Sequence, residues 1–183
     1  MKKLILATLM AGLVPMIALA QGTVNFQSAS ANAIVVTAIG PNVPVGAGYI
    51  AALYGGSLGS LEAALNPLGA TAPVTAGTGL IIAGGTRVYN GVTPGAQGTF
   101  QVRAWTASSG GDWIAAIQSG VGFAGKTPLF NNPTGDPTAS PPGTPAFLSG
   151  WTAPLLVTPI PEPSTIALAG LGLASLLVIR RRK

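Results

Sequence analysis

Residues 85–105 read "GTRVYNGVTPGAQGTFQVRAW" and carry the clearest secondary-structure signal in the chain. The pairs Asn90-Gly91 and Pro94-Gly95 are typical of turns, and the segments on either side are suited to strands. In the second segment two sets of side chains alternate: Phe100, Val102 and Ala104 with Gln101, Arg103 and Trp105. A period of two places each set on one face of a strand, so we expect two strands around a turn.

Similar strand signals recur along the chain at "GTVNFQ" (22–27), "NAIVVTAIG" (32–40) and "AGYIAALYGG" (47–56). "SLEAALNPLG" (60–69) and "DWIAAIQSG" (112–120) each allow a short helical turn, and we expect Asp112 to cap the second. The spacing of turn signals predicts an all-β fold, an antiparallel β-sandwich of roughly seven or eight strands with short helical turns.

Charge is scarce and unevenly placed. The chain has 183 residues, a formal net charge of +5, and only 7% charged residues. Between residues 21 and 159 there are three cations and three anions, which cancel: Arg87, Arg103, Lys126, Glu62, Asp112 and Asp136. Binding to a phosphate backbone requires clustered Lys and Arg, so we expect no nucleic-acid partner.

The first 20 residues are typical of a secretory signal peptide. Lys2 and Lys3 precede an apolar segment, and the small residues Ala18 and Ala20 fit the A-x-A cleavage pattern. Cleavage after Ala20 would make Gln21 the new N-terminus, which leaves residues 21–159 as the body.

The C-terminal segment, 160–183, has three parts. Pro161, Glu162 and Pro163 come first, followed by Ser164 and Thr165; an apolar helix is predicted over 164–179. The chain closes on a basic cluster: Arg180, Arg181, Arg182 and Lys183. The apolar run is short for a single transmembrane helix, but the basic cluster agrees with the positive-inside rule. We therefore expect a precursor held transiently in the inner membrane with its body outside the cytoplasm.

The two prolines keep the preceding backbone out of the helical region, so the Pro-Glu-Pro stretch is expected to be extended. A processing enzyme can bind such a segment, whereas a simple anchor does not need it. With the apolar run and the basic cluster, this stretch resembles the PEP-CTERM sorting signal of Gram-negative bacteria. The resemblance implies a membrane processing enzyme, an exosortase, that cuts near the motif, and a link to exopolysaccharide and biofilm production.

The body is similar, more loosely, to secreted proteins that carry this tail in Verrucomicrobia-like bacteria. The segments that carry the likeness are "AQGTVNF" (20–26), "AALYGG" (51–56), "EAALNPLG" (62–69) and "QVRAW" (101–105). Those proteins are mostly of unassigned function, so the likeness implies a fold and no activity.

"GVGFAGKT" (120–127) satisfies the nucleotide-binding P-loop pattern, with Lys126 and Thr127 in the phosphate and Mg²⁺ positions. A P-loop must open a helix, but Pro128 and a Gly/Pro-rich segment follow Thr127. We therefore interpret the match as a product of glycine-rich composition and predict no cofactor.

The sequence contains no Cys and no His, which removes the commonest nucleophiles, bases and metal ligands. Glycoside hydrolysis would need two of the three body carboxylates. The aromatic residues offer either core packing or a flat platform for sugar rings; they are Trp105, Trp113, Trp151, Tyr49, Tyr54 and Tyr89. We expect an exported, non-enzymatic surface or matrix protein; the alternative is an extracellular polysaccharide-binding module.

Overall fold

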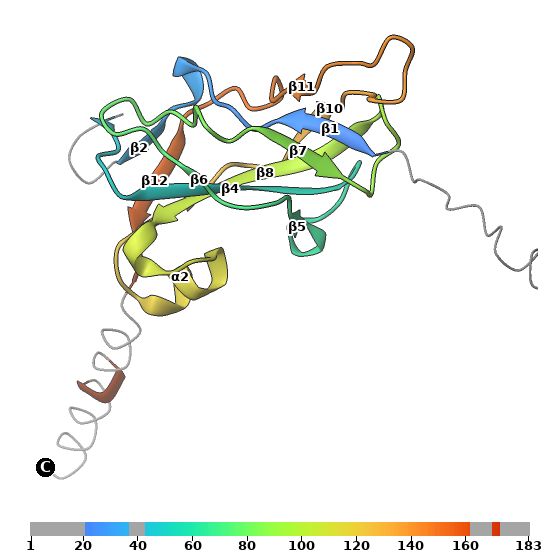
Figure 1. The fold of residues 1–183 in the computed structure, drawn as a ribbon. Coiled ribbons are helices and arrows are strands. Elements are labelled where there is room, and N and C mark those ends of the chain that lie inside the picture. The colour runs from blue at the N-terminus through green and yellow to red at the C-terminus, as the bar shows by residue number, and fades with distance from the viewer. Residues whose placement is uncertain (1–20, 37–42, 162–169, 173–183) are drawn as a thin grey trace, which may run out of the picture.

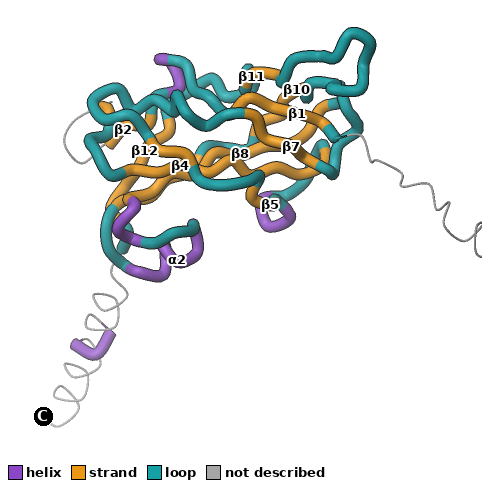
Figure 2. Tube along the Cα trace, in the orientation of Figure 1, coloured by secondary structure: helices purple, strands orange, loops and turns teal. Residues whose placement is uncertain are grey.

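The computed structural model describes residues 21–36, 43–161 and 170–172. In this part of the chain, a small β-sheet packs over a larger one, and a short helix lies on the far side of the larger sheet (Figures 1 and 2). The all-β prediction is confirmed.

The smaller sheet has the strand order β11-β1-β7. Its central strand β1 (Gly22–Asn25) runs antiparallel to β7 (Thr86–Tyr89) and parallel to β11 (Ala146–Phe147). The pair β1–β7 therefore joins the first predicted strand of the body to the first half of the 85–105 stretch.

The larger sheet follows the path β3-β2-β12-β9-β8-β4-β5, with β10 paired to β8 and β6 paired to β4. Its strands, in chain order, are β2 (Ile34–Val36), β3 (Val43–Pro44), β4 (Tyr49–Ser57), β5 (Asn66–Pro67), β6 (Ala72–Pro73), β8 (Gln97–Thr106), β9 (Phe123–Lys126), β10 (Phe130–Pro133) and β12 (Leu155–Pro159). The long antiparallel pair β4–β8, in register from Tyr49↔Thr106 to Ser57↔Gly98, forms its centre.

The sheets are mixed, because two of the pairings are parallel. In addition to β1–β11, β12 lies parallel to β2, with Val157 opposite Val36. The two strands predicted within residues 85–105 also belong to different sheets, since β7 pairs with β1 while β8 pairs with β4, β9 and β10. The turn between them is thus a crossover from one layer to the other.

The main hydrophobic core lies between the two sheets. Phe100, Val102 and Ala104 on β8 point into it and are fully buried. Val24 of β1 joins them from the smaller sheet, and Leu53 joins them from β4, the neighbouring strand of the larger sheet. The alternation predicted that these three side chains share one face, and the structure shows that this face is the one turned to the core.

The opposite face of β8 is also covered. Helix α2 (Trp113–Ser119) lies against it, and Ala116 of α2 packs with Trp105 and Ile160 in a second apolar cluster. Asp112 caps α2 as predicted, its carboxylate accepting the Ala115 N–H at 2.9 Å. The body also has three short 3₁₀ helices: η1 (Ser30–Asn32), η2 (Glu62–Ala64) and η3 (Ala107–Ser109).

Several predicted features lie outside the described residues. These are the signal peptide 1–20, residues 162–165 of the sorting motif, and the basic cluster 180–183. The predicted apolar helix 164–179 is described only at 170–172, which are helical and exposed. Among the described residues, we find no helix that is long and apolar enough to span a bilayer.

Candidate functional site

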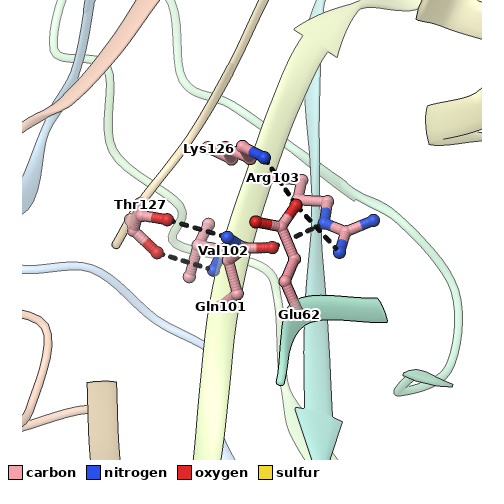
Figure 3. A network of polar contacts seen from close by, with 6 residues as sticks. All are labelled: Glu62, Gln101, Val102, Arg103, Lys126 and Thr127. Atoms are coloured by element: carbon pink, nitrogen blue, oxygen red, sulfur yellow. Dashed lines mark hydrogen bonds and ion pairs between the residues drawn. The ribbon is translucent and has the colours of Figure 1, made fainter. Parts of the chain in front are cut away.

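The outer face of the larger sheet carries a polar and aromatic cluster centred on Arg103 (Figure 3). The Arg103 side chain is only 10% exposed. Its guanidinium carbon lies 3.9 Å from the centroid of the Tyr54 ring and 5.5 Å from that of Trp113. Its Nε donates a hydrogen bond to Gln101 Oε1 at 2.8 Å. Alternation along β8 places Gln101 and Arg103 on one face, which allows this bond.

Glu62 reaches the cluster from η2. Its Oε1 accepts a hydrogen bond from Lys126 Nζ at 2.5 Å and lies 3.7 Å from an Arg103 nitrogen (Figure 3). The hydrogen bond from Lys126 holds the pKa of the Glu62 carboxyl below its usual value, and the charges of Lys126 and Arg103 act in the same direction. Glu62 is therefore an anion at neutral pH, engaged by two cations.

A groove of about 910 Å³ lies between this cluster and helix α2. Arg103 is at its base, and Tyr54 and Trp113 contribute half-buried aromatic rings. The polar residues Glu62, Asp112 and Gln118 also line it. Burial raises the pKa of Tyr54, and the nearby Arg103 partly opposes this effect. The groove thus combines aromatic surface with carboxylate and amide groups, which can accept and donate hydrogen bonds.

The six aromatic residues considered for a sugar platform do not share one surface. Trp105, Trp151 and Tyr49 are buried. Tyr89 is half-buried and packs edge-to-face on Phe100 with ring centroids 6.4 Å apart, on the inner side of β8. Only Tyr54 and Trp113 line the same groove, so core packing accounts for most of the set.

The three body carboxylates are also divided. Glu62 and Asp112 line the groove, whereas Asp136 accepts hydrogen bonds from the Thr138 N–H and hydroxyl in a remote loop, which lower the pKa of its carboxyl. Within the described residues, no three His, Cys, Asp or Glu side chains gather as metal ligands.

The P-loop pattern at 120–127 begins at the end of a helix and ends one residue after a strand. Gly120 terminates α2 in the left-handed conformation at φ 68°, and residues 123–126 form β9. Lys126 binds Glu62, and the Thr127 hydroxyl accepts the Val102 N–H at 3.0 Å. Gly125 is required because a Cβ there would collide with the Leu156 carbonyl of β12. These residues therefore have structural partners, and the pattern does not form the strand–loop–helix that a phosphate site needs.

The chain leaves the body at the end of β12. Ile160, the first residue of the predicted tail, is 7% exposed and donates its N–H to the Gly122 carbonyl at 2.9 Å. The next residue, Pro161, is exposed. At the other end, Gln21 is half-buried directly before β1. The described residues thus place the start of the Pro-Glu-Pro stretch at the surface of the folded body, with no linker before it.

Residues 159–183 match the family model described as the PEP-CTERM protein-sorting motif. The chain carries a PEP-CTERM sorting motif. The match begins within β12, so the motif is joined to a strand inside the larger sheet. Neither the curated proteins nor the solved structures contain a match to this chain.

The PEP-CTERM motif implies an exported protein that is anchored in a membrane before an exosortase, a membrane enzyme, processes it. The match covers only the tail. The likeness of the body to secreted proteins of Verrucomicrobia-like bacteria stays a prediction.

Sequence reasoning did not find the Arg103 cluster. Arg103 was placed on one face of β8 with Trp105, but its partners Tyr54, Glu62 and Trp113 come from three other segments. The available signal was a lone cation inside an apolar strand, which requires a partner when buried. The body contains only three anions, so the sequence limited the possible ionic partners of Arg103 but did not show which of them it contacts.

Proposed function

We propose that this chain is an exported, non-enzymatic protein of the cell surface or extracellular matrix, delivered by exosortase processing and linked to exopolysaccharide or biofilm. The observation that carries the proposal is the junction at Ile160, where the folded β-sheet body is joined without a linker to a PEP-CTERM motif. Processing near the motif would release a body that keeps β12 intact.

The state of the carboxylates supports a non-enzymatic body. Glu62 is paired with cations, Asp112 caps α2, and Asp136 is bonded to Thr138. General acid–base catalysis by a carboxyl pair requires one group with a raised pKa, but the shifts at Glu62 and Asp136 are both downward.

The test is complementation of a deletion strain, with matrix polysaccharide and biofilm mass as readouts. A variant with Glu62→Gln, Asp112→Asn and Asp136→Asn should restore both to the wild-type level. Glu162→Ala should not, and mass spectrometry of its membrane fraction should show an unprocessed C-terminus. If the triple variant is exported and folded but fails to restore the matrix, the carboxylates take part in the function, as a hydrolase or a polysaccharide-binding groove would require.

The groove beside Arg103 favours a second candidate, an extracellular polysaccharide-binding module. Aromatic rings and hydrogen-bonding side chains in one groove are what sugar recognition uses. Saturable binding to the producer's own polysaccharide, lost in Gln118→Ala and Trp113→Ala but kept in Phe147→Ala, would support it. Phe147 is a suitable control because it is 67% exposed on β11 in the other sheet.

A further inference from the structure

Helix α2 has two unlike sides. Ala116 is fully buried against the second apolar cluster. Ile117 on the helix and Val121 just beyond it are 41% and 56% exposed, and Ile114 is 65% exposed at the border of the groove. We call Ile114, Ile117 and Val121 the α2 apolar face. Large aliphatic side chains gathered on one short segment are a common mark of a contact surface.

Helix α2, which carries this face, lies beside the point where the chain leaves the body (Figure 1). Val121 directly precedes Gly122, whose carbonyl accepts the Ile160 N–H. Ile160 also packs in the same cluster as Ala116. The exit of the tail is therefore fixed to the C-terminal end of α2 by a hydrogen bond and by apolar packing.

The distance from this exit to the apolar run of the tail is short. Five residues, 161–165, separate Ile160 from Ile166, where the apolar run begins. From Ile160 to Ile166 the chain makes six Cα-to-Cα steps, which reach at most about 22 Å when fully extended. While the apolar run is held in a membrane, the exit at Ile160 stays within about 22 Å of it, and the C-terminal end of α2, which Ile160 contacts, stays near the lipid surface.

We propose that the α2 apolar face rests on the lipid surface while the tail holds the precursor in the membrane, and that processing releases it. This inference rests on the membrane-held precursor of the proposed function. The short tether gives the α2 apolar face a high effective concentration at the lipid surface. Three side chains are therefore enough for contact while the tail is in the membrane, but they give little affinity for lipid once the body has been released. The body is formally neutral, and Asp112 at the start of α2 is already engaged as a cap. The contact is thus apolar and should be insensitive to salt.

Cysteine labelling tests the proposal, because the chain contains no Cys. The full chain, recovered from membranes of cells without a processing enzyme, is placed in lipid nanodiscs at one chain per disc. Val121→Cys is compared with Ile82→Cys, its matched control, since Val121 is 56% and Ile82 58% exposed. The rate of reaction with a soluble maleimide in discs is divided by the rate in denaturant. We expect this ratio to be at least roughly fivefold lower for Val121→Cys than for Ile82→Cys, since thiol reactivity follows exposure.

A second variant separates lipid contact from local packing. Ile117→Gln on the Val121→Cys background keeps a good helix former but removes the apolar side chain, so the ratio should rise toward that of Ile82→Cys. Equal ratios at positions 121 and 82 would overturn docking and leave the membrane-held precursor intact. Recovery of the chain outside the discs would overturn both. In a second preparation with two chains per disc, slow labelling that is absent at one chain per disc would identify a second copy, and not lipid, as the occupant.

Discussion

Both faces of strand β8 are buried, but the inner face is apolar, whereas the outer face is polar and aromatic. The inner face presents Phe100, Val102 and Ala104 to an apolar core between the sheets. The outer face presents Gln101, Arg103 and Trp105 to α2 and η2, where burial is accompanied by hydrogen bonds and ring stacking. The inner face stabilises the fold through area removed from water, whereas the outer face positions the groove and the exit of the tail.

The largest effect is expected on the inner face. Phe100 is fully buried, with the rings of Tyr89 and Phe130 at 6.4 and 6.3 Å. Phe100→Ala leaves a cavity between the sheets and should lower the free energy of unfolding by about 3–5 kcal/mol. Urea unfolding followed by tryptophan fluorescence measures the loss. A loss below about 1 kcal/mol would show that the two sheets do not depend on this contact.

On the outer face, Arg103→Lys should have an intermediate effect. Lysine keeps the charge but loses the flat stacking on Tyr54 and the directed bond to Gln101, so we expect about 1–2 kcal/mol of destabilisation in the same urea assay. Arg87→Lys is the matched control. The Arg87 guanidinium carbon lies 5.6 Å from the Phe26 ring, a looser stack, and should matter less. Equal losses would mean that burial of a cation, and not stacking, dominates.

Removing the N-terminal cap of α2 should destabilise the outer face of β8 and leave the inner face unchanged. Asp112→Ala removes the acceptor for the Ala115 N–H and should cost about 1 kcal/mol. Because α2 packs on the outer face, hydrogen exchange should quicken in residues 113–119 and stay unchanged in the inner strands. Asp112→Asn retains a capping side chain and should show nearly wild-type exchange. Faster exchange throughout β4 and β8 in Asp112→Ala would show that the faces are coupled.

The inner face was predictable from local pattern, because alternation along a strand reports which residues share a side. Phe100, Val102 and Ala104 were placed together on this basis, and the cap at Asp112 followed from its position before a helical segment. The parallel pairings were not predictable. Strand β12 at 155–159 pairs with β2 at 34–36, more than a hundred residues earlier, and no short-range signal specifies such a partner. The Arg103 cluster likewise brings Tyr54, Glu62 and Trp113 to β8 from separate segments, and it was missed because no local pattern specifies those partners.

The smallest effect is expected where the outer face meets solvent, at the Lys126–Glu62 pair. Both side chains are substantially exposed, 46% and 40%, so solvent screens the pair and Lys126→Ala should cost less than about 1 kcal/mol at pH 7. The sign of its pH dependence follows from the lowered pKa of Glu62. A carboxyl whose pKa is lower in the folded state adds stability above its unfolded pKa, near 4.3, and loses it as the pH falls through the folded pKa. The small difference between wild type and Lys126→Ala should therefore be present at pH 7 and disappear once the pH has fallen below the folded-state pKa of Glu62. Urea unfolding of both proteins at pH 7 and in acid checks this.

The same variant tests the P-loop pattern. ATP should shift the melting temperature of neither protein, because Lys126 is engaged by Glu62 and the pattern does not open a helix. An ATP-dependent shift that Lys126→Ala abolishes would mean that Lys126 binds phosphate and not only Glu62.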